Sequence, residues 1–305
     1  MESRIVYFGT PDFAVPPLIK LAEDFQVVGV VTQPDRPAGR GRKLVPSAVK
    51  AAALKLGLEV FQPENANSEK SLEKLRGWDP DLICVAAYGQ ILKRALLDMP
   101  RFGCINVHAS LLPRWRGASP INTAILQGDS HTGVTIMKMG PGLDDGPILT
   151  QESVEILPDE TAGSLSDRLS VLGGKLLSTT ILPYIEGKIE PQTQDHSLST
   201  YAPQLNKSAG ELDFDLAAEI LARTVRAFSP WPGTFTYWND KRLIIHKTRA
   251  VSVTSPGAGV LTLYDGYPAI GAGSGLLVLE ELQLAGKKRV SGPAFLNGNP
   301  DWIAP

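Results

Sequence analysis

The sequence predicts an α/β protein in which a doubly wound, mostly parallel sheet is followed by a small β-barrel. In the first part of the chain, apolar strand-like runs alternate with helical segments, which is typical of a parallel sheet. These runs are apolar at nearly every position, as expected when helices cover both faces of the sheet. Later, short strands follow one another closely with Gly and Pro between them, a pattern typical of small barrels.

The first domain, of Rossmann-like type, is predicted over residues 1–189. Continuous apolar runs predict four buried strands, at 4–10, 27–33, 81–88 and 103–109. Helices are predicted near 14–23, near 68–77 with Asn67 or Ser68 as N-cap, and from Ser119 as N-cap with Pro120 in the first turn. Two further strands near 133–139 and 147–156 and a long helix over about 161–186 complete the domain.

A polar, Pro-containing stretch over 190–206 is predicted to be a linker to a second domain at 207–305. The second domain begins with a helix at 215–227. Five short strands follow, predicted at 233–238, 242–248, 258–264, 267–272 and 275–284. Their spacing favours an OB-like β-barrel.

Composition limits the class of protein. With 305 residues, 43% hydrophobic and 20% charged, the chain is expected to be a soluble globular protein. Pro11 and Asp12 interrupt the N-terminal apolar run, and no run approaches the ~18 apolar residues of a membrane helix. We therefore expect a cytoplasmic protein with no membrane partner, whose two cysteines, Cys84 and Cys104, are reduced and buried.

Several common kinds of site do not fit the sequence. The stretch "YFGTPDFA" lacks the glycine spacing of a dinucleotide fingerprint, and "AGRGRKL" lacks the GK[ST] ending of a phosphate loop. The four histidines are scattered and neither cysteine has a partner at zinc spacing, so no metal is expected. No serine lies in a GxSxG elbow. A dinucleotide oxidoreductase is therefore a distant alternative.

The stretch "CINVHASLLPRWRG" at 104–117 carries the first candidate site residues. Because alternate residues of a strand point to the same face, Asn106 and His108 are expected to project side by side. They lie at the carboxyl end of a predicted strand, where ligands bind in open α/β sheets. A histidine at the end of a strand is also commonly structural, and that alternative stays open.

Asp144, in the loop "GPGLDDGPILT", is the third candidate, although an Asp beside Gly is commonly a turn former. His108 can exchange a proton near neutral pH, and Asn106 offers an uncharged donor to a developing oxyanion. Asp144 can orient the imidazole and stabilise its charge. This combination suits an acyl transfer in which the substrate supplies the nucleophile.

Residues 34–50, "PDRPAGRGRKLVPSAVK", carry five basic residues against Asp35 alone. Such a local patch can contact phosphates even on a protein with a net charge of −2. A solvated surface loop is the alternative. The one basic cluster of the second domain is Lys287, Lys288 and Arg289.

The motifs "INVHASLLPRWRG" and "GLDDGP" resemble the active-site signature of the folate-dependent formyltransferases, which move a formyl group from 10-formyltetrahydrofolate to an amine. Three further stretches resemble the members that act on methionyl-tRNA: "FGTPDFA" at 8–14, "QPDRPAGRGRKL" at 33–44 and "LQLAGKKRVSGPAFLNG" at 282–298. The resemblance covers essentially the whole chain. It implies a translation-initiation enzyme with 10-formyltetrahydrofolate as donor and methionyl-initiator-tRNA as acceptor, and no metal.

Carried over to matching positions, the resemblance implies that Asn106, His108 and Asp144 are the catalytic residues. It implies a folate site formed by two segments, Ser110, Leu111, Leu112 and Pro113 with a cis Leu112–Pro113 bond, and Tyr88, Gln90, Ile91 and Leu92. The tRNA-binding residues are expected in the basic loop and in the C-terminal β domain: Arg36, Arg40, Arg42 and Lys43, and Lys287, Lys288 and Arg289. For Arg114, Trp115 and Arg116, structural and binding roles both stay open.

Two alternatives are nearer than the dinucleotide oxidoreductase. One is a family member acting on a small amine, glycinamide ribonucleotide or an amino sugar, against which the basic loop and the β domain argue. The other is a noncatalytic RNA-binding protein, which would not need Asn106, His108 and Asp144 together. Nothing in the sequence requires a dimer, so we expect a monomer.

Overall fold

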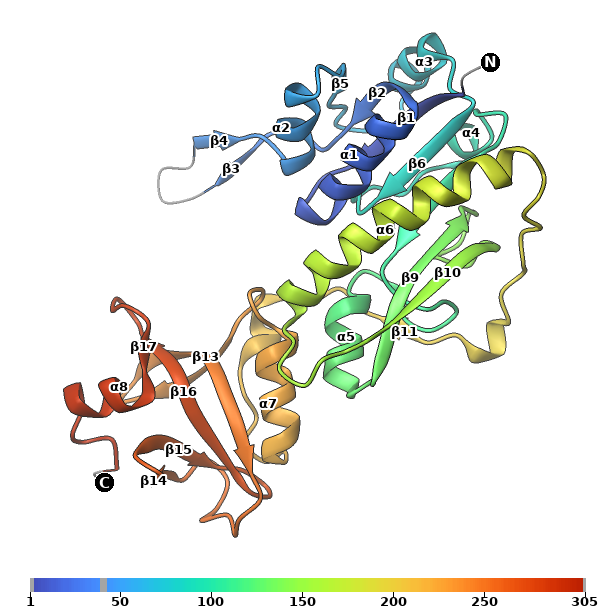
Figure 1. The fold of residues 1–305 in the computed structure, drawn as a ribbon. Helices are drawn as coiled ribbons and strands as arrows, with labels where there is room; N and C mark the ends of the chain where they lie inside the picture. Colours follow the sequence, from blue (N-terminus) through green and yellow to red (C-terminus); the bar gives the residue numbers. More distant parts are fainter. Residues whose placement is uncertain (1–2, 39–42, 304–305) are drawn as a thin grey trace. The chain divides into compact units, whose positions relative to one another are not determined.

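The computed structural model describes residues 3–38 and 43–303, which fall into two compact units (Figure 1). Unit 1 comprises residues 1–120, 131–155 and 166–202. Unit 2 comprises residues 121–130, 156–165 and 203–305. Two short segments that precede residue 202 therefore belong with the C-terminal sheet, and the chain passes between the units more than once.

Unit 1 is built on a seven-stranded sheet in the order β10-β9-β7-β6-β1-β2-β5. The strands from β7 to β5 run parallel to their neighbours, whereas β9 is antiparallel to both β7 and β10. The strands are β1 (Arg4–Gly9), β2 (Gln26–Val31), β5 (Val60–Phe61), β6 (Leu82–Ala86), β7 (Cys104–His108), β9 (His131–Lys138) and β10 (Ile148–Glu155). The predicted mostly parallel sheet is confirmed, and the carboxyl ends of its parallel strands lie at one edge.

Helices cover both faces of this sheet, as a doubly wound fold requires. On one face α1 and α6 lie side by side, and Gly174 of α6 approaches the backbone of Pro16 so closely that a Cβ there would lie 3.1 Å from its carbonyl oxygen (Figure 1). Ser68 caps α3 by accepting from the Ser71 N–H, so it is the N-cap among the two candidates. The helices of this unit are η1 (Asp12–Ala14), α1 (Val15–Asp24), α2 (Ala48–Lys55), α3 (Glu69–Trp78), α4 (Arg94–Leu97), most of α6 (Ala162–Ile185) and η2 (His196–Leu198).

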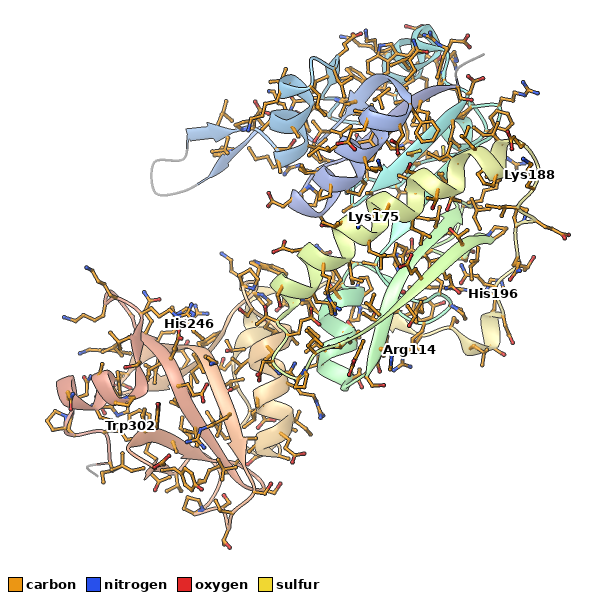
Figure 2. All side chains as sticks on the ribbon, viewed as in Figure 1. Arg114, Lys175, Lys188, His196, His246 and Trp302 are labelled. Carbon is orange, nitrogen blue, oxygen red and sulfur yellow. The ribbon has the colours of Figure 1, made fainter. Side chains whose placement is uncertain are left out.

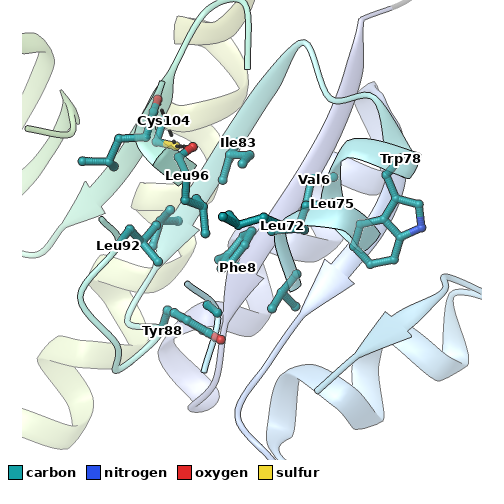
Figure 3. Packing of buried hydrophobic residues seen from close by; sticks show 14 residues of the cluster. Val6, Phe8, Leu72, Leu75, Trp78, Ile83, Tyr88, Leu92, Leu96 and Cys104 are labelled. Carbon is teal, nitrogen blue, oxygen red and sulfur yellow. Dashed lines mark hydrogen bonds between the residues drawn. The ribbon is translucent and has the colours of Figure 1, made fainter. Parts of the chain in front are cut away.

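The core on the other face packs β1 and β6 against α3 and α4 (Figure 3). Val6 and Phe8, which share a face of β1, are fully buried beside Leu75. The ring of Phe8 meets that of Tyr88 edge-on, with 5.0 Å between the centroids. Cys104 lies in the same cluster as a free, buried thiol, and burial raises its pKa to about 12. This thiol therefore stays protonated and contributes as a small apolar group.

Unit 2 contains an antiparallel sheet in the order β12-β13-β16-β15-β14, with β17 beside β16. Two register shifts on either side of Lys247 bend β13, which pairs with both β12 and β16. Among the described residues no ladder joins β12 to β14, so the sheet stays open where a complete barrel would close. The elements are α5 (Pro120–Gln127), η3 (Lys207–Gly210), α7 (Ala218–Ala227), β12 (Thr234–Trp238), β13 (Lys241–Val251), β14 (Leu261–Tyr264), β15 (Tyr267–Gly271), β16 (Leu276–Leu284), β17 (Val290–Ser291) and α8 (Gly292–Gly298).

Several short elements were not predicted from the sequence. The basic segment is a hairpin of β3 (Arg36–Ala38) and β4 (Lys43–Val45), and β8 (Arg116–Gly117) pairs in parallel with β11 (Tyr201–Ala202). Strands of two or three residues contain too few positions to show an alternating pattern. They form because a partner segment pairs with them. The remaining unpredicted elements are β5, β17, η1, η2, η3, α2, α4 and α8.

The core of unit 2 depends on an aromatic cluster of Trp238, Phe295 and Trp302. Trp302 is 1% exposed, and its Nε1–H donates to the Thr262 carbonyl oxygen at 2.9 Å.

The substitution Trp302→Ala is expected to lower the free energy of unfolding of unit 2 by about 3–5 kcal/mol, because it removes a buried ring and leaves a cavity. Urea unfolding followed by circular dichroism measures this change. Ile303→Ala, at a neighbouring side chain that is 53% exposed, is the control, and an equal loss in both variants would contradict the assignment.

Candidate active site

Strand β7 positions the first two candidate residues. Asn106 pairs with Val85 of β6 and with Met137 of β9, and His108 lies opposite Thr135. Two residues apart on one strand, Asn106 and His108 share a face at the carboxyl end of the parallel sheet. His108 is 5% exposed, whereas Asn106 is half-buried. No hydrogen bond to the Asn106 side-chain amide occurs among the described residues.

The loop after β7 fixes the histidine ring. His108 Nε2 lies 2.9 Å from the Trp115 carbonyl oxygen, and because a carbonyl only accepts, Nε2 must carry the proton. The other ring nitrogen, Nδ1, lies 3.7 Å from Oδ2 of Asp144. In neutral His108, Nδ1 is therefore the ring nitrogen without a proton, and the atom nearest to it from Asp144 is a carboxylate oxygen.

Asp144 is held by backbone as well as by its neighbours. It adopts the left-handed region with φ 48°, and its Oδ2 accepts from the Gly117 N–H at 2.9 Å. Its side chain is 19% exposed, so the carboxylate lies at the border between protein and solvent. Gly117 itself has φ 116°, and a Cβ there would lie 2.5 Å from the Ala202 carbonyl oxygen. Only glycine fits at that position.

The bend "SLLP" follows His108 and is held by two side chains from the antiparallel strands. The hydroxyl of Thr135 donates to the Ser110 carbonyl oxygen at 2.6 Å and accepts from the Leu112 N–H at 3.1 Å. Gln151 Nε2 donates to the Leu112 carbonyl oxygen and to Thr135 Oγ1, both at 2.8 Å. The Leu112–Pro113 peptide bond is cis, as the family resemblance implies. Leu112 is 3% exposed, whereas Leu111 and Pro113 are partly exposed.

The second predicted folate segment, residues 88–92, places its side chains differently. Tyr88 and Leu92 are buried in the core of unit 1, and burial raises the pKa of Tyr88 to about 12. Gln90 is tied to the neighbouring loop, where its Oε1 accepts from the Ala66 N–H at 2.9 Å. Ile91 is 82% exposed and is the apolar side chain of this segment that faces solvent. The backbone carbonyl of Tyr88 accepts from Thr10 Oγ1 at 2.8 Å.

A cavity of about 390 Å³ lies between the carboxyl ends of β1, β2 and β6 and the base of the β3–β4 hairpin. Thr10, Gln33, Arg36 and Ser47 are among its lining residues. The hairpin base is fixed by Asp35, whose carboxylate pairs with Lys50 at 2.6 Å and accepts from Gln62 at 2.7 Å. The hydrogen bond from Lys50, then that from Gln62, lower the pKa of Asp35. The ionised carboxylate of Asp35 therefore holds the base of the basic hairpin against Lys50 and Gln62.

The predicted tRNA-binding residues lie in both units. Arg36 is exposed on β3, and Lys43 begins β4, whereas Arg40 and Arg42 lie outside the described residues. In unit 2 the cluster Lys287, Lys288 and Arg289 is exposed in the turn before β17, and Arg289 pairs with Glu281.

The structure also describes the Arg-Trp-Arg segment, whose first residue, Arg114, is labelled in Figure 2. Arg114 is exposed and its guanidinium lies over the ring of Trp115, 4.1 Å from the centroid. Arg116 is 2% exposed and donates to Gln194 and His196. Burial removes Arg116 from any contact with a phosphate, so its role is within the protein. Gln194 was not predicted from the sequence, since nothing local marks a glutamine in a polar stretch.

Other kinds of site find no support in the part of the chain that the structure describes. Over residues 3–38 and 43–303, no group of three or more His, Cys, Asp or Glu side chains is arranged to hold a metal ion. Within the same residues, no helix combines the length and apolar character needed to span a bilayer.

Comparisons with known proteins agree with the geometry. A model of the family described as "Formyl transferase" matches residues 3–181, and one described as "Formyl transferase, C-terminal domain" matches residues 204–300. A methionyl-tRNA formyltransferase of Citrifermentans bemidjiense is 45% identical over 296 residues, which cover 97% of this chain and 93% of that protein. One from Bacillus subtilis is 46% identical over 300 residues, with coverages of 97% and 95%.

Solved structures share the fold at lower identity. The sugar 3N-formyl transferase WlaRD, solved in the presence of dTDP and 5-N-formyl-THF, has a TM-score of 0.67 at 18% identity, covering 94% of this chain and all (100%) of that one. HypX from Aquifex aeolicus in complex with tetrahydrofolic acid has a TM-score of 0.63 at 14% identity, covering 100% of this chain and 48% of that one. By its sequence matches, the chain belongs to the formyl transferase family and, within it, to the methionyl-tRNA formyltransferases.

Proposed function

We propose that this protein transfers a formyl group from 10-formyltetrahydrofolate to the α-amino group of methionyl-initiator-tRNA. The observation that carries the proposal is the His108–Asp144 pair beside the open Asn106 amide, at the carboxyl edge of the sheet. None of Asn106, His108 and Asp144 is assigned as a nucleophile, so the amine of the substrate must attack. Family membership supplies the class of reaction.

In the proposed reaction the protein stabilises an oxyanion and transfers a proton. The methionyl amine attacks the formyl carbon as a neutral group, and a new C–N bond forms while the carbonyl oxygen becomes an oxyanion. We assign the donor to that oxyanion to the Asn106 amide, and such a donor contributes about 3 kcal/mol of transition-state stabilisation. The C–N bond to the folate then breaks, and the electron pair remains on the folate nitrogen.

The proton lost by the attacking nitrogen has to reach the leaving folate nitrogen. Because Nε2 of His108 is engaged by Trp115, Nδ1 is the ring nitrogen that exchanges this proton. Asp144 at 3.7 Å stabilises the imidazolium without holding Nδ1–H in a short hydrogen bond. General acid–base catalysis of this kind is worth roughly 10²–10⁴-fold in rate.

The folate is proposed to bind along the bend at 110–113 and the segment 88–92. Ile91 supplies an exposed apolar side chain, and the backbone of the bend supplies peptide groups in fixed positions. The structure provides this rigidity through Thr135 and Gln151, which hold both sides of Leu112. A planar heterocycle suits such a site, where peptide groups fix its orientation and apolar groups exclude water.

The tRNA is proposed to bind through the basic hairpin and the cluster at 287–289. Arg36 and the cluster at 287–289 are exposed, and such Lys and Arg side chains provide the salt-dependent attraction to phosphates that nucleic acids require. A small amine acceptor, such as an amino sugar, is the alternative, and sugar formyltransferases share the fold at 18–20% identity. The relatives that are 44–47% identical over nearly the whole chain favour methionyl-tRNA.

The assignment of substrate has a direct test. The protein is incubated with labelled 10-formyltetrahydrofolate and, separately, with methionyl-tRNA, uncharged tRNA or glycinamide ribonucleotide. Label is expected on methionyl-tRNA alone. Label on glycinamide ribonucleotide would instead support the small-amine alternative.

The catalytic roles predict distinct losses. Asn106→Ala is expected to lower kcat about 10²–10³-fold by removing the oxyanion donor. His108→Ala is expected to lower kcat about 10²–10⁴-fold by removing the proton carrier. Single-turnover transfer of labelled formyl measures both. His131→Ala, at the exposed start of β9, is the matched histidine control and should stay close to the unmodified protein.

The folate bend predicts an effect on the donor. Thr135→Val removes the hydroxyl that holds the bend and leaves the Leu112 N–H without this partner, at a cost of about 1–3 kcal/mol. The KM for 10-formyltetrahydrofolate is expected to rise about 5- to 100-fold, and Thr135→Ser should restore it. Thr132→Val on the same strand is the control, because the Thr132 hydroxyl is buried and has no hydrogen-bond partner among the residues that the structure describes. Equal KM values for the two valine variants would refute this role.

The basic residues predict a change in salt dependence. We expect two double variants to weaken tRNA binding. One carries Arg42→Ala and Lys43→Ala, and the other carries Lys287→Ala and Lys288→Ala. Each lost phosphate contact should reduce the slope of log K against log salt concentration by about 1. Filter binding at several salt concentrations measures both quantities. Lys70→Ala, at an exposed lysine of α3, is the control, and an unchanged slope in either double variant removes that site from the proposal.

A further inference from the structure

The segment that follows α6 forms part of the scaffold around Asp144. This segment, residues 192–202, is called the strap below. Its first residue, Gln192, exchanges two backbone hydrogen bonds of 2.8 Å with Ile148 at the start of β10. Its last residues pair with the loop after β7: the Arg116 N–H donates to the Thr200 carbonyl oxygen and the Ala118 N–H to that of Ala202, both at 2.9 Å. The strap is therefore hydrogen-bonded to both chain segments that flank the site.

Gln194, in the middle of the strap, uses its whole amide group. Its Nε2 donates to the carbonyl oxygens of Asp144 at 2.9 Å and Gly146 at 2.7 Å. Its Oε1 accepts from Arg116, from Nε at 3.1 Å and from Nη2 at 2.7 Å. Both donors and both acceptor positions are thereby occupied, and the side chain is 3% exposed. One side chain therefore joins the backbone of the Asp144 loop, at Asp144 and Gly146, to Arg116 in the loop that holds His108.

Arg116 is buried in a way that costs stability. It is 2% exposed, and its acceptors are the amide oxygen of Gln194 and Nδ1 of His196 at 3.1 Å, which are neutral groups. Over the described residues no carboxylate pairs with it. A buried guanidinium without a counter-charge is expensive, and such departures from good packing are found chiefly where position serves function. Arg116 fixes the Gln194 amide so that its N–H groups, not its oxygen, face the Asp144 loop.

The backbone at both ends of this network is strained. Trp115 has φ 61° and Asp144 has φ 48°, and neither residue is glycine. A residue other than glycine is disfavoured in the left-handed region, Trp more than Asp, and it persists there only where its surroundings hold it. Thr200 of the strap holds Trp115 by accepting from its N–H at 2.9 Å, and Gln194 holds Asp144. These two strained residues also provide the two groups that face the His108 ring.

We propose that Gln194 is a positioning residue that sets the place of the Asp144 carboxylate beside His108, and that Arg116 orients Gln194 for this purpose. The inference rests on the proposed function, since it takes Asp144 to act in formyl transfer. Arg116 contacts no substrate in this role. It acts through Gln194, and Gln194 acts through the backbone of the Asp144 loop.

The substitution Gln194→Glu separates this role from simple burial. The glutamate is the same size and keeps an oxygen for Arg116, with which it now forms a charged pair. Its second oxygen replaces the two N–H donors and faces the carbonyl oxygens of Asp144 and Gly146, which repel it. We expect kcat for formyl transfer to fall about 10- to 100-fold, with KM for both substrates and 5-formyltetrahydrofolate binding changed less than about threefold. Gln192→Glu makes the same change two residues away at an exposed side chain and should leave kcat unaltered.

A double-mutant cycle shows whether the loss passes through Asp144. In an Asp144→Asn background, Gln194→Glu is expected to cause little further loss in single-turnover rate, because the group it positions is already impaired. Equal fold-losses in both backgrounds, or a Gln194→Glu rate equal to that of Gln192→Glu, would overturn the proposal. Arg116→Lys changes the residue that donates to Gln194 Oε1. Lys cannot present two forked N–H groups, so kcat should fall in the unmodified background and stay unchanged beside Asp144→Asn.

The unmodified protein is assayed first. If it transfers no formyl group to methionyl-tRNA, the proposed function fails before any variant is compared. If it does and the cycle shows no coupling, the proposed function stands and the positioning role is rejected. Thermal unfolding of every variant shows that the compared chains are folded, and an Arg116→Lys rate equal to the unmodified rate would reject the part assigned to Arg116.

Discussion

The hydrogen bond between His108 Nε2 and the Trp115 carbonyl oxygen is the interaction on which the arrangement of the site depends. It decides which ring nitrogen carries the proton and leaves Nδ1 directed toward Asp144. The same turn supplies the Gly117 N–H that holds the Asp144 carboxylate. One short loop therefore fixes both members of the pair, and any shift of the loop moves them together. The sheet supplies the rest, because it places Asn106 two residues before His108 on the same face.

Most of the fold could be predicted from local pattern. The parallel strands β1, β2, β6 and β7 are continuous apolar runs with clear ends, and α3 begins at a Ser with a polar first turn. The missed elements have a common cause. β8 and β11 contain two residues each, and they exist because residue 116 meets residue 201 across the chain, which no local window shows. The basic hairpin likewise alternates too briefly to be told from a loop.

In the candidate site, too, the residues that stand in local motifs could be predicted, and the partners that are distant in sequence could not. Asn106, His108 and Asp144 stand in motifs, and the structure brings His108 and Asp144 together. What holds them could not be predicted, since the partners are far apart in sequence: Arg116 and Gln194 are 78 residues apart, and Leu112 and Gln151 are 39 apart. For Arg116 the sequence left binding and structural roles open, and burial decides between them. The side chains of Tyr88 and Leu92 lie in the core, which a motif match alone does not reveal.

The strap has a consequence for how the catalytic sheet can be treated as a module. The family model for the N-terminal part ends at residue 181 and the one for the C-terminal part begins at 204, so the strap falls between them. A chain cut at the end of α6 would retain Asn106, His108 and Asp144 but lose Gln194 and Thr200. In any recombination of this sheet with a different second domain, the junction belongs after Ala202. A stretch that resembles a spacer in sequence thus belongs to unit 1, and the hydrogen bonds made by its own residues limit which lengths and compositions it can have.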